Sequence, residues 1–212
     1  MATILLTGFE PFGDDARNPS GEAVTEISRR WGGNDHLVTA VLPVAFDEAA
    51  AALRALIAAY APDIVIATGL AGGRTRVTPE RVAINLRDAR IPDNSGAVPI
   101  DEPCVEGGPS AHFATLPVKA IARAIDGSGI PSAVSHTAGT FVCNHVMYVA
   151  LDEAAQRPGM RAGFVHVPWS DETAPGGAPS LPSAALVRAL ELAVRTTLAH
   201  ARDVDVSAGT LH

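Results

Sequence analysis

The chain has 212 residues, of which 47% are hydrophobic and 18% charged, so it can build a buried core and is not a disordered protein. The net charge of −7, without any run of Lys or Arg, excludes a typical nucleic-acid-binding protein. No segment approaches the roughly 18 apolar residues of a membrane span, and the first residues lack the pattern of a signal peptide. We therefore expect one cytoplasmic domain over residues 1–212, with no membrane partner.

Short apolar runs alternate with longer segments of helical periodicity, a pattern that predicts a mainly parallel sheet covered by helices on both faces. In the first third of the chain, Asn18-Pro19-Ser20 resembles a helix cap with proline in the first turn. The expected elements here are strands over 4–7, 37–42 and 64–67 and helices over 22–31 and 46–60.

Two loops interrupt the pattern in the rest of the chain. Residues 88–110 contain several Pro and Gly with little periodicity, and residues 168–182 contain four prolines, so both are expected as surface excursions that can cover a site. The expected elements are helices over 119–125, 144–156 and 183–200 and strands over 133–136 and 163–167.

Cys143 follows an apolar stretch and stands just before the helix expected over 144–156. The unpaired N–H groups and the positive dipole end at a helix start favour the thiolate, which is the reactive form of cysteine. With two cysteines in the chain, no disulfide framework is expected. Cys143 is therefore a candidate nucleophile.

A cysteine nucleophile needs a base, and the base needs a third group to orient it. Among seven histidines, His136 and His166 lie at or near the carboxyl ends of expected strands, where open α/β sheets place their ligands. His166 is the better candidate because it leaves a buried strand directly into a loop. The alternative is a core histidine bonded to backbone. His145 is a poor partner for Cys143, because two positions along a helix separate side chains by about 200°.

Glu80 is one of several carboxylates that could orient the imidazole. It follows Thr78-Pro79 and precedes an apolar stretch. Thr-Pro-Glu is also an ordinary helix or turn start, in which Glu caps backbone N–H groups, and from the residues alone capping is the favoured interpretation.

The glycine-rich segment 69–74 offers a different chemistry, because its N–H groups and Arg74 could cradle a phosphate. The segment is neither a P-loop nor a dinucleotide-binding fingerprint. No pair of Cys or His residues has a recognised metal-ligand spacing, so no metal is expected.

Several motifs in order resemble the pyroglutamyl peptidase I family of cysteine peptidases, also called pyrrolidone-carboxylate peptidases. The resemblance spans nearly the whole chain. Its motifs are LTGFEPFG at 6–13 with NPS at 18–20, GGR at 72–74 with ERVAIN at 80–85, RIPDN at 90–94, GTFVCN at 139–144 and FVHVP at 164–168.

The resemblance implies a three-layer α/β/α sandwich with a twisted, mixed, mostly parallel open sheet, and a homo-oligomer, dimer or tetramer, without cofactor or metal. It implies a triad of Cys143 as nucleophile, His166 as base and then acid, and Glu80 as the orienting group, which overturns the capping interpretation. The implied reaction removes an N-terminal pyroglutamyl residue from small peptides through a thioester. The oxyanion donors would be the Cys143 backbone N–H and Arg90.

Pyroglutamate is a compact, uncharged lactam, so its pocket should have apolar walls with few polar groups. The family's pocket positions match Phe9, Phe12, Asn18, Leu70, Ile91, Phe141, Val142 and Met147.

The chain departs from the family pattern at two places. Many family members have Gln at the position of Leu70, and residues 169–172 also differ from the usual pattern. Leu70 leaves open a thiol hydrolase for another small cyclic or N-acyl group, and the glycine segment leaves open a non-catalytic binder of phosphate or a nucleoside. Cys104 matches no catalytic motif.

Overall fold

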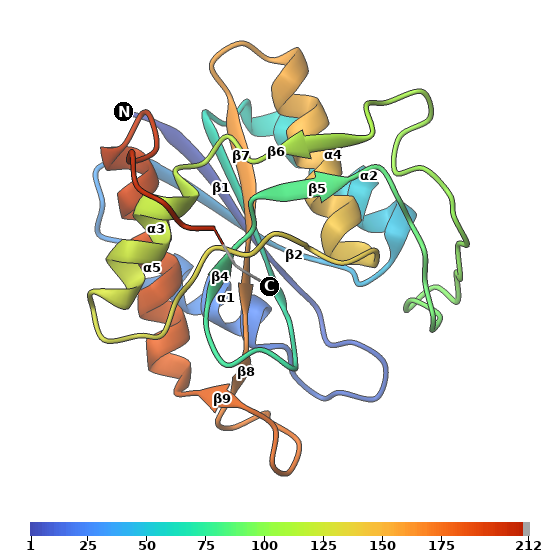
Figure 1. Cartoon of the computed structure of the whole chain (residues 1–212), viewed down its shortest axis with the longest axis horizontal. Coiled ribbons are helices and arrows are strands. Elements are labelled where there is room, and N and C mark those ends of the chain that lie inside the picture. The colour runs from blue at the N-terminus through green and yellow to red at the C-terminus, as the bar shows by residue number, and fades with distance from the viewer. Residues whose placement is uncertain (210–212) are drawn as a thin grey trace.

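A computed structural model describes residues 1–209, and a five-stranded sheet with the order β2-β1-β3-β7-β4 forms its centre (Figure 1). Neighbouring strands from β2 to β7 are parallel, and β4 pairs with β7 in the antiparallel direction. The expected mixed, mostly parallel open sheet is therefore confirmed. The strands are β1 (Thr3–Phe9), β2 (His36–Leu42), β3 (Ile64–Leu70), β4 (Thr78–Pro79) and β7 (Arg161–Val167).

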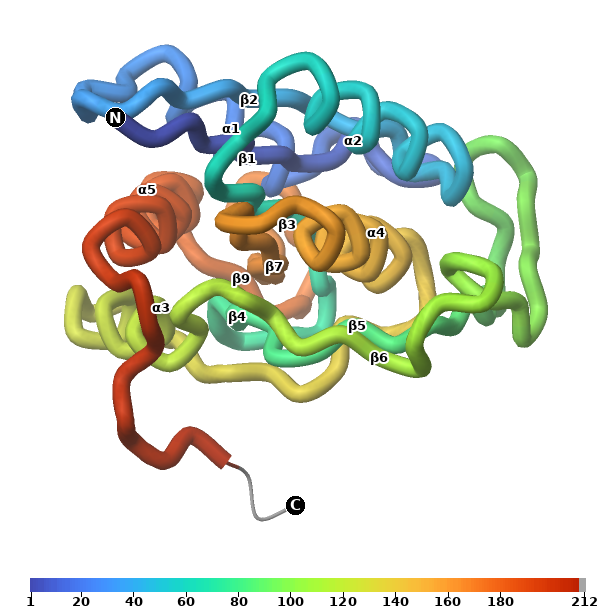
Figure 2. Tube along the Cα trace, turned by 90° about the horizontal axis from the view of Figure 1, so that it is seen from above, coloured from blue at the N-terminus to red at the C-terminus, as the bar shows by residue number. Residues whose placement is uncertain are grey.

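Helices cover both faces of this sheet, which makes three layers (Figure 2). Successive strand residues point to opposite faces. In β1, Ile4 packs in the core on one face and Leu5 packs in the core on the other. The first face carries α1 (Pro19–Arg30), α3 (Val118–Asp126) and α5 (Ser183–Ala199), and the second carries α2 (Phe46–Tyr60) and α4 (Val142–Gln156).

Local sequence signals set the ends of the first two helices. The Asn18 side chain accepts a hydrogen bond from the Ser20 N–H at 3.0 Å, and Pro19 occupies the first turn of α1. Helix α2 ends at Ala61, whose φ of 42° is left-handed, and Pro62 follows and cannot continue the helix. Helix α2 has the bounds expected from the sequence, and α1 begins at Pro19, three residues before the expected start at residue 22.

One local prediction is wrong, and one alternative left by the residues alone is excluded. Residues 133–136 form no strand; Ser135 makes an isolated bridge to Glu80, and Ser132, just before the segment, makes one to Val77. The Ser135 hydroxyl bonds to the backbone of Thr137 instead, and such local bonds compete with a strand ladder. Thr78-Pro79 does not start a helix but forms β4, which lies at the edge of the sheet, where proline is tolerated.

Short strands also occur where only loops were expected. Residues 69–70 extend β3, and the loops contain two small ladders. The ladders pair β5 (Val82–Ile84) with β6 (Ala111–Phe113) and β8 (Trp169–Ser170) with β9 (Ser180–Leu181). Elements of two or three residues carry too little periodicity to be read from sequence.

The 88–110 segment is anchored over the carboxyl edge of the sheet. Asp93 accepts a hydrogen bond from the Phe46 N–H at the start of α2, at 2.8 Å. Asn94 donates to the Pro11 carbonyl at 2.9 Å and accepts from the Gly13 N–H at 3.1 Å. The loop therefore holds Ile91 near the segment after β1. Among residues 1–209, no helix is long and apolar enough to span a membrane.

Candidate active site

The carboxyl ends of β1, β3 and β7 meet the first turn of α4 at one edge of the sheet. In the ladder between β3 and β7, Gly69 is the register partner of His166. A Cβ atom at Gly69 would lie 2.8 Å from Sγ of Cys143 and 2.9 Å from the ring of Phe164, which is two residues before His166 on the same face. The thiol and the imidazole therefore share one face of the sheet.

Cys143 is the second residue of α4, which begins two residues earlier than expected. The segment before it is irregular, and no side chain caps the helix start at Phe141. The free N–H groups of this first turn point out of the helix, and the Cys143 N–H is one of them. His145 packs against Phe46 of α2 with ring centroids 5.9 Å apart, so it does not partner the thiol, as predicted.

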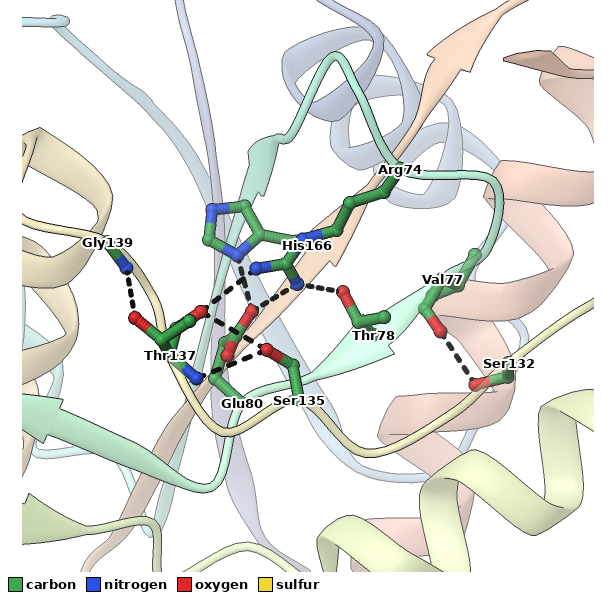
Figure 3. Close-up of polar contacts among 9 residues, drawn as sticks. All are labelled: Arg74, Val77, Thr78, Glu80, Ser132, Ser135, Thr137, Gly139 and His166. Atoms are coloured by element: carbon green, nitrogen blue, oxygen red, sulfur yellow. Dashed lines mark hydrogen bonds and ion pairs between the residues drawn. The ribbon is translucent and has the colours of Figure 1, made fainter. Parts of the chain in front are cut away.

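Glu80 and His166 form a buried pair (Figure 3). Oε1 of Glu80 lies 2.7 Å from Nδ1 of His166. Glu80 is held there because its backbone N–H donates to the Phe164 carbonyl at 2.9 Å, directly after β4 pairs with β7. Glu80 thus orients an imidazole and does not cap a helix.

The carboxylate determines the tautomer of His166. An ionised carboxylate only accepts hydrogen bonds, so Nδ1 carries the proton and donates it to Glu80. In the neutral ring, Nε2 then has a free lone pair, and no residue among 1–209 bonds to it. His166 can therefore accept a proton at Nε2.

Burial and charge set the protonation states of the three groups. Burial opposes ionisation of Glu80, but the hydrogen bond to His166 and the nearby positive charge of Arg74 outweigh it, so the pKa of Glu80 is lowered. Burial lowers the pKa of His166, and Glu80 only partly opposes this effect. At neutral pH the pair is therefore a carboxylate and a neutral imidazole.

The thiol of Cys143 is protonated in the free protein. Its pKa is raised to about 12, mainly by burial and also by the negative charge of Glu80, and Arg74 only partly opposes these two effects. Burial therefore outweighs the helix start, which we expected to favour the thiolate. The proton must leave the thiol as the reaction begins, and the neutral His166 is suited to take it.

Arg74 lies beside this pair and was interpreted from the sequence only as a phosphate ligand. Its guanidinium donates to Glu80 at 2.5 Å, to the Thr78 hydroxyl and to the Thr137 carbonyl at 2.9 Å. Gly72 packs beneath the indole of Trp169. The arginine is thus directed at the carboxylate and is not free for a phosphate.

A cavity of about 260 Å³ opens at Cys143. Its walls are mostly apolar and come from the loop after β1, the end of β3, the 88–110 loop and the start of α4. The expected residues lining it are Phe9, Phe12, Asn18, Leu70, Ile91, Phe141 and Val142, and Asp15, Val44, Gly72 and Trp169, which the sequence reasoning missed, line it as well. The pattern of the sequence contained no signal for Val44 or Trp169, which reach the cavity through loop folding.

Two expected site residues, Met147 and Arg90, do not line the cavity. Met147 is fully buried in the core below the cavity and does not line it, because it lies one turn further along α4. Arg90 is exposed and does not line the cavity, although its neighbour Ile91 does. Asn18 lines it, but its side chain is occupied by the α1 cap and by the Glu10 carbonyl.

Cys104 is buried away from the cavity, and its thiol faces the carbonyls of Ile84 and Leu86. Burial raises its pKa to about 11, so it is unreactive. Both cysteines are free. Within residues 1–209, no cluster of three or more His, Cys, Asp or Glu side chains could hold a metal ion.

A thiol at a helix start, on the same sheet face as a neutral imidazole that a carboxylate orients, defines a cysteine hydrolase on an α/β sandwich. The sequence profile described as "Pyroglutamyl peptidase" matches residues 2–200. The pyrrolidone-carboxylate peptidase of Clavibacter michiganensis subsp. michiganensis is 53% identical over 212 residues, which is 100% of both chains.

Solved structures agree with this comparison. The crystal structure of pyroglutamyl peptidase I from Bacillus amyloliquefaciens is 45% identical with a TM-score of 0.92, over 96% of this chain and 100% of that one. The pyrrolidone carboxyl peptidase from Thermococcus litoralis is 38% identical with a TM-score of 0.93, over 98% of this chain and 100% of that one. The chain belongs to the pyroglutamyl peptidase family, and the resemblance seen in the sequence is confirmed. It is therefore a cysteine-type peptidase, a hydrolase of peptide bonds.

Proposed function

We propose that Cys143, His166 and Glu80 are the catalytic triad of this peptidase, which hydrolyses the bond after an N-terminal pyroglutamyl residue. One observation carries this assignment. Oε1 of Glu80 lies 2.7 Å from Nδ1 of His166. Gly69 is the register partner of His166, and Sγ of Cys143 lies against Gly69, so the thiol is next to the oriented imidazole's place in the sheet.

The reaction begins with the protonated thiol. Sγ of Cys143 attacks the carbonyl carbon of the pyroglutamyl residue, while its proton passes to Nε2 of His166. The tetrahedral intermediate then collapses, the C–N bond breaks, and His166 returns the proton to the departing amine. Water next attacks the thioester, with His166 again as base, and releases pyroglutamate and the free thiol. Glu80 stabilises the imidazolium in both halves.

The oxyanion is expected to accept hydrogen bonds from the Cys143 backbone N–H and from Arg90. The N–H has no intrahelical partner at the start of α4. Arg90 is exposed and precedes Ile91 of the cavity wall, so its flexible side chain would have to move toward the cavity when substrate binds. Loss of one such donor typically lowers the rate by about 100-fold or more.

The cavity at Cys143 fits a small uncharged ring. Its aromatic wall is built by Phe12 and Phe141, whose ring centroids are 5.5 Å apart, with Leu70 and Ile91 nearby. A charged N-terminal amine would lose its hydration against the apolar walls, which costs several kcal/mol, and Asp15, the carboxylate in the lining, is exposed, so water screens its attraction. The cavity therefore favours the neutral lactam over an ordinary N-terminus. Leu70 adds to the apolar wall. Because its side chain cannot form hydrogen bonds, we expect backbone groups to form those with the lactam.

A matched pair of substrates tests this function. The purified protein is incubated with a fluorogenic pyroglutamyl amide and with the matching prolyl amide, which lacks the lactam carbonyl. We expect hydrolysis of the first only, and its loss in Cys143→Ser and after thiol alkylation. Equal turnover of the pyroglutamyl and prolyl amides would show a different substrate class. Turnover by Cys143→Ser would show that the thiol is not the nucleophile.

We also propose that the protein acts on small peptides in the cytoplasm, as one domain over residues 1–212 assembled into a homo-oligomer, dimer or tetramer. The family resemblance supports the oligomer, and the two free cysteines fit a reducing compartment. Sedimentation equilibrium of the purified chain, with a monomer mass of 21.9 kDa, measures the assembly directly.

A further inference from the structure

One guanidinium, that of Arg74, connects three segments of the active site (Figure 3). It lies in the loop after β3 and has a side chain that is 25% exposed. Its Nη1 donates to Glu80 and to the Thr78 hydroxyl, and its Nη2 donates to the Thr137 carbonyl at 2.9 Å. The segments it joins are those that carry the orienting carboxylate and lead to the nucleophile.

Arg74 and His166 bond to the same oxygen of Glu80. Oε1 accepts from Arg74 at 2.5 Å and lies 2.7 Å from Nδ1 of His166, while Oε2 is buried without a hydrogen-bond partner among the described residues. A hydrogen bond from a charged donor to a carboxylate is stronger than a hydrogen bond between two neutral groups. Without Arg74, the buried carboxylate of Glu80 would lose its charged hydrogen-bond donor and could turn away from the imidazole.

The contact to Thr137 reaches toward the nucleophile. The Gly139 N–H donates to the Thr137 hydroxyl at 3.1 Å, and Thr140 follows and bonds to the Asp88 carbonyl at 2.7 Å. Helix α4 starts two residues later. Arg74 therefore connects the carboxylate to the turn from which Cys143 emerges.

We propose that Arg74 is a positioning residue for the reaction, which acts through Glu80: it holds the carboxylate against His166 and links it to the segment that precedes Cys143. This inference rests on the proposed triad. Arg74 touches neither the reacting thiol nor the cavity wall, since it does not line the cavity at Cys143.

The charge of Arg74 also influences the pH dependence. The groups that act on one another here come from four places: Glu80 after β4, His166 on β7, Cys143 on α4 and Arg74 after β3. Burial is the main cause of the lowered pKa of His166, Glu80 raises it, and Arg74 lowers it. Removal of the positive charge should therefore raise the pKa of His166. Because kcat/KM at low pH depends on the unprotonated base, its acid limb should move to higher pH.

Three variants test the inference. Arg74→Met removes the charge and the hydrogen bonds, Arg74→Lys keeps the charge, and Arg76→Met is the matched control, since Arg76 is exposed two residues away. For Arg74→Met we expect kcat to fall on the order of 100-fold with KM little changed, and the acid limb to move up. Arg74→Lys should keep the acid limb and lose part of kcat. Arg76→Met should match the parent protein.

A second readout does not depend on substrate. In a Cys104→Ala background, the rate of iodoacetamide alkylation at Cys143 is measured against pH for each variant, with thermal unfolding recorded in parallel. Loss of Arg74 should move the alkylation profile to higher pH, because Arg74 lowers the pKa of Cys143. If Arg74→Met does not fold, Arg74→Lys provides the test. We expect its kcat to be lower than that of the parent protein, with an unchanged KM and an unchanged acid limb of kcat/KM.

Two results would overturn the inference. One is an Arg74→Met enzyme with the parent kcat and acid limb; the other is a loss confined to KM, which would mean that Arg74 binds substrate. Glu80→Gln and Cys143→Ser run beside these variants. If either of those keeps full activity, the triad itself is wrong, and that failure is distinct from a failure of Arg74 alone.

Discussion

Oε1 of Glu80 lies 2.7 Å from Nδ1 of His166, although 86 residues separate them in the chain. The contact exists because β4 reverses direction beside β7, so that Thr78 pairs with His166 and Glu80 follows next to the imidazole. Both side chains are buried, with 0% and 4% of their surface exposed, so water cannot replace either partner. The orientation of the base therefore depends on this one strand pairing.

Glu80→Gln should lower kcat on the order of 1,000-fold. The amide can donate to Nδ1, which favours the wrong tautomer of His166, and it cannot stabilise an imidazolium. Steady-state kinetics with a pyroglutamyl amide measures the loss, and circular dichroism checks the fold. Activity within a few-fold of the parent would mean that Glu80 does not orient the base.

Gly69→Ala should lower kcat by about 100-fold, because a small displacement of a reacting group has an effect of that size. The new Cβ would lie 2.8 Å from Sγ of Cys143 and 2.9 Å from the Phe164 ring, so the thiol has to move. Gly73→Ala is the control, since a Cβ there meets no heavy atom within 4 Å. Equal kinetics of the two variants would contradict the placement of the thiol against β3.

Phe12→Ala should raise KM for pyroglutamyl substrates by about 10- to 100-fold, which corresponds to the burial of one large apolar side chain. Phe12 packs edge-on against Phe141 in the cavity wall. Phe113→Ala serves as the control, because Phe113 is 70% exposed on β6, away from this cavity. An unchanged KM in Phe12→Ala would remove this ring from substrate binding.

Asn144→Ala should lower the free energy of unfolding by about 2–4 kcal/mol, because it leaves buried backbone groups without partners. The fully buried Asn144 side chain accepts from the Ile84 N–H at 3.0 Å and donates to the carbonyls of Ile84 and Leu86 at 2.9 and 3.0 Å. Urea unfolding measures the change. Gln156→Ala, an exposed position on the same helix, should change stability by less than about 0.5 kcal/mol. A similar small change for Asn144→Ala would contradict its anchoring role.

His145→Met should flatten the dependence of stability on pH below neutrality. Burial, with the positive charge of Arg87, lowers the pKa of His145 from 6.5 to about 4, so between these values the unfolded chain binds a proton that the folded protein does not. The stabilisation is complete above pH 6.5 and is lost as the pH falls toward 4, at up to about 1.4 kcal/mol per pH unit.

Urea unfolding of both proteins at about pH 7, which is above this range, and at about pH 6 and 5, which are within it, measures the two slopes. His166 contributes in the same direction in both proteins, so the difference between them isolates His145. Parallel curves would show that His145 is protonated to the same extent in the folded and unfolded states.

Much of the fold follows from local signals in the sequence. Apolar periodicity and caps such as Asn18-Pro19 predicted the long helices and the four parallel strands. Cys143 at a helix start and His166 at a strand end were also recognisable, because each depends only on where one element ends. The family followed from motifs in order and was confirmed by comparison.

The rest depended on contacts between distant segments. From the residues alone Glu80 is interpreted as a cap; the family motifs indicate its role beside the imidazole, and the pairing of β4 with β7 explains its position. Arg74 is interpreted from the residues as a phosphate ligand, but its guanidinium contacts Glu80. Met147 lies in the core because its place on α4 turns it inward, a direction that a motif does not encode. The sequence by itself determined which chemical groups this protein has and on which elements they lie. Only the tertiary structure decided which of them meet, because register and burial arise from packing between elements far apart in the chain.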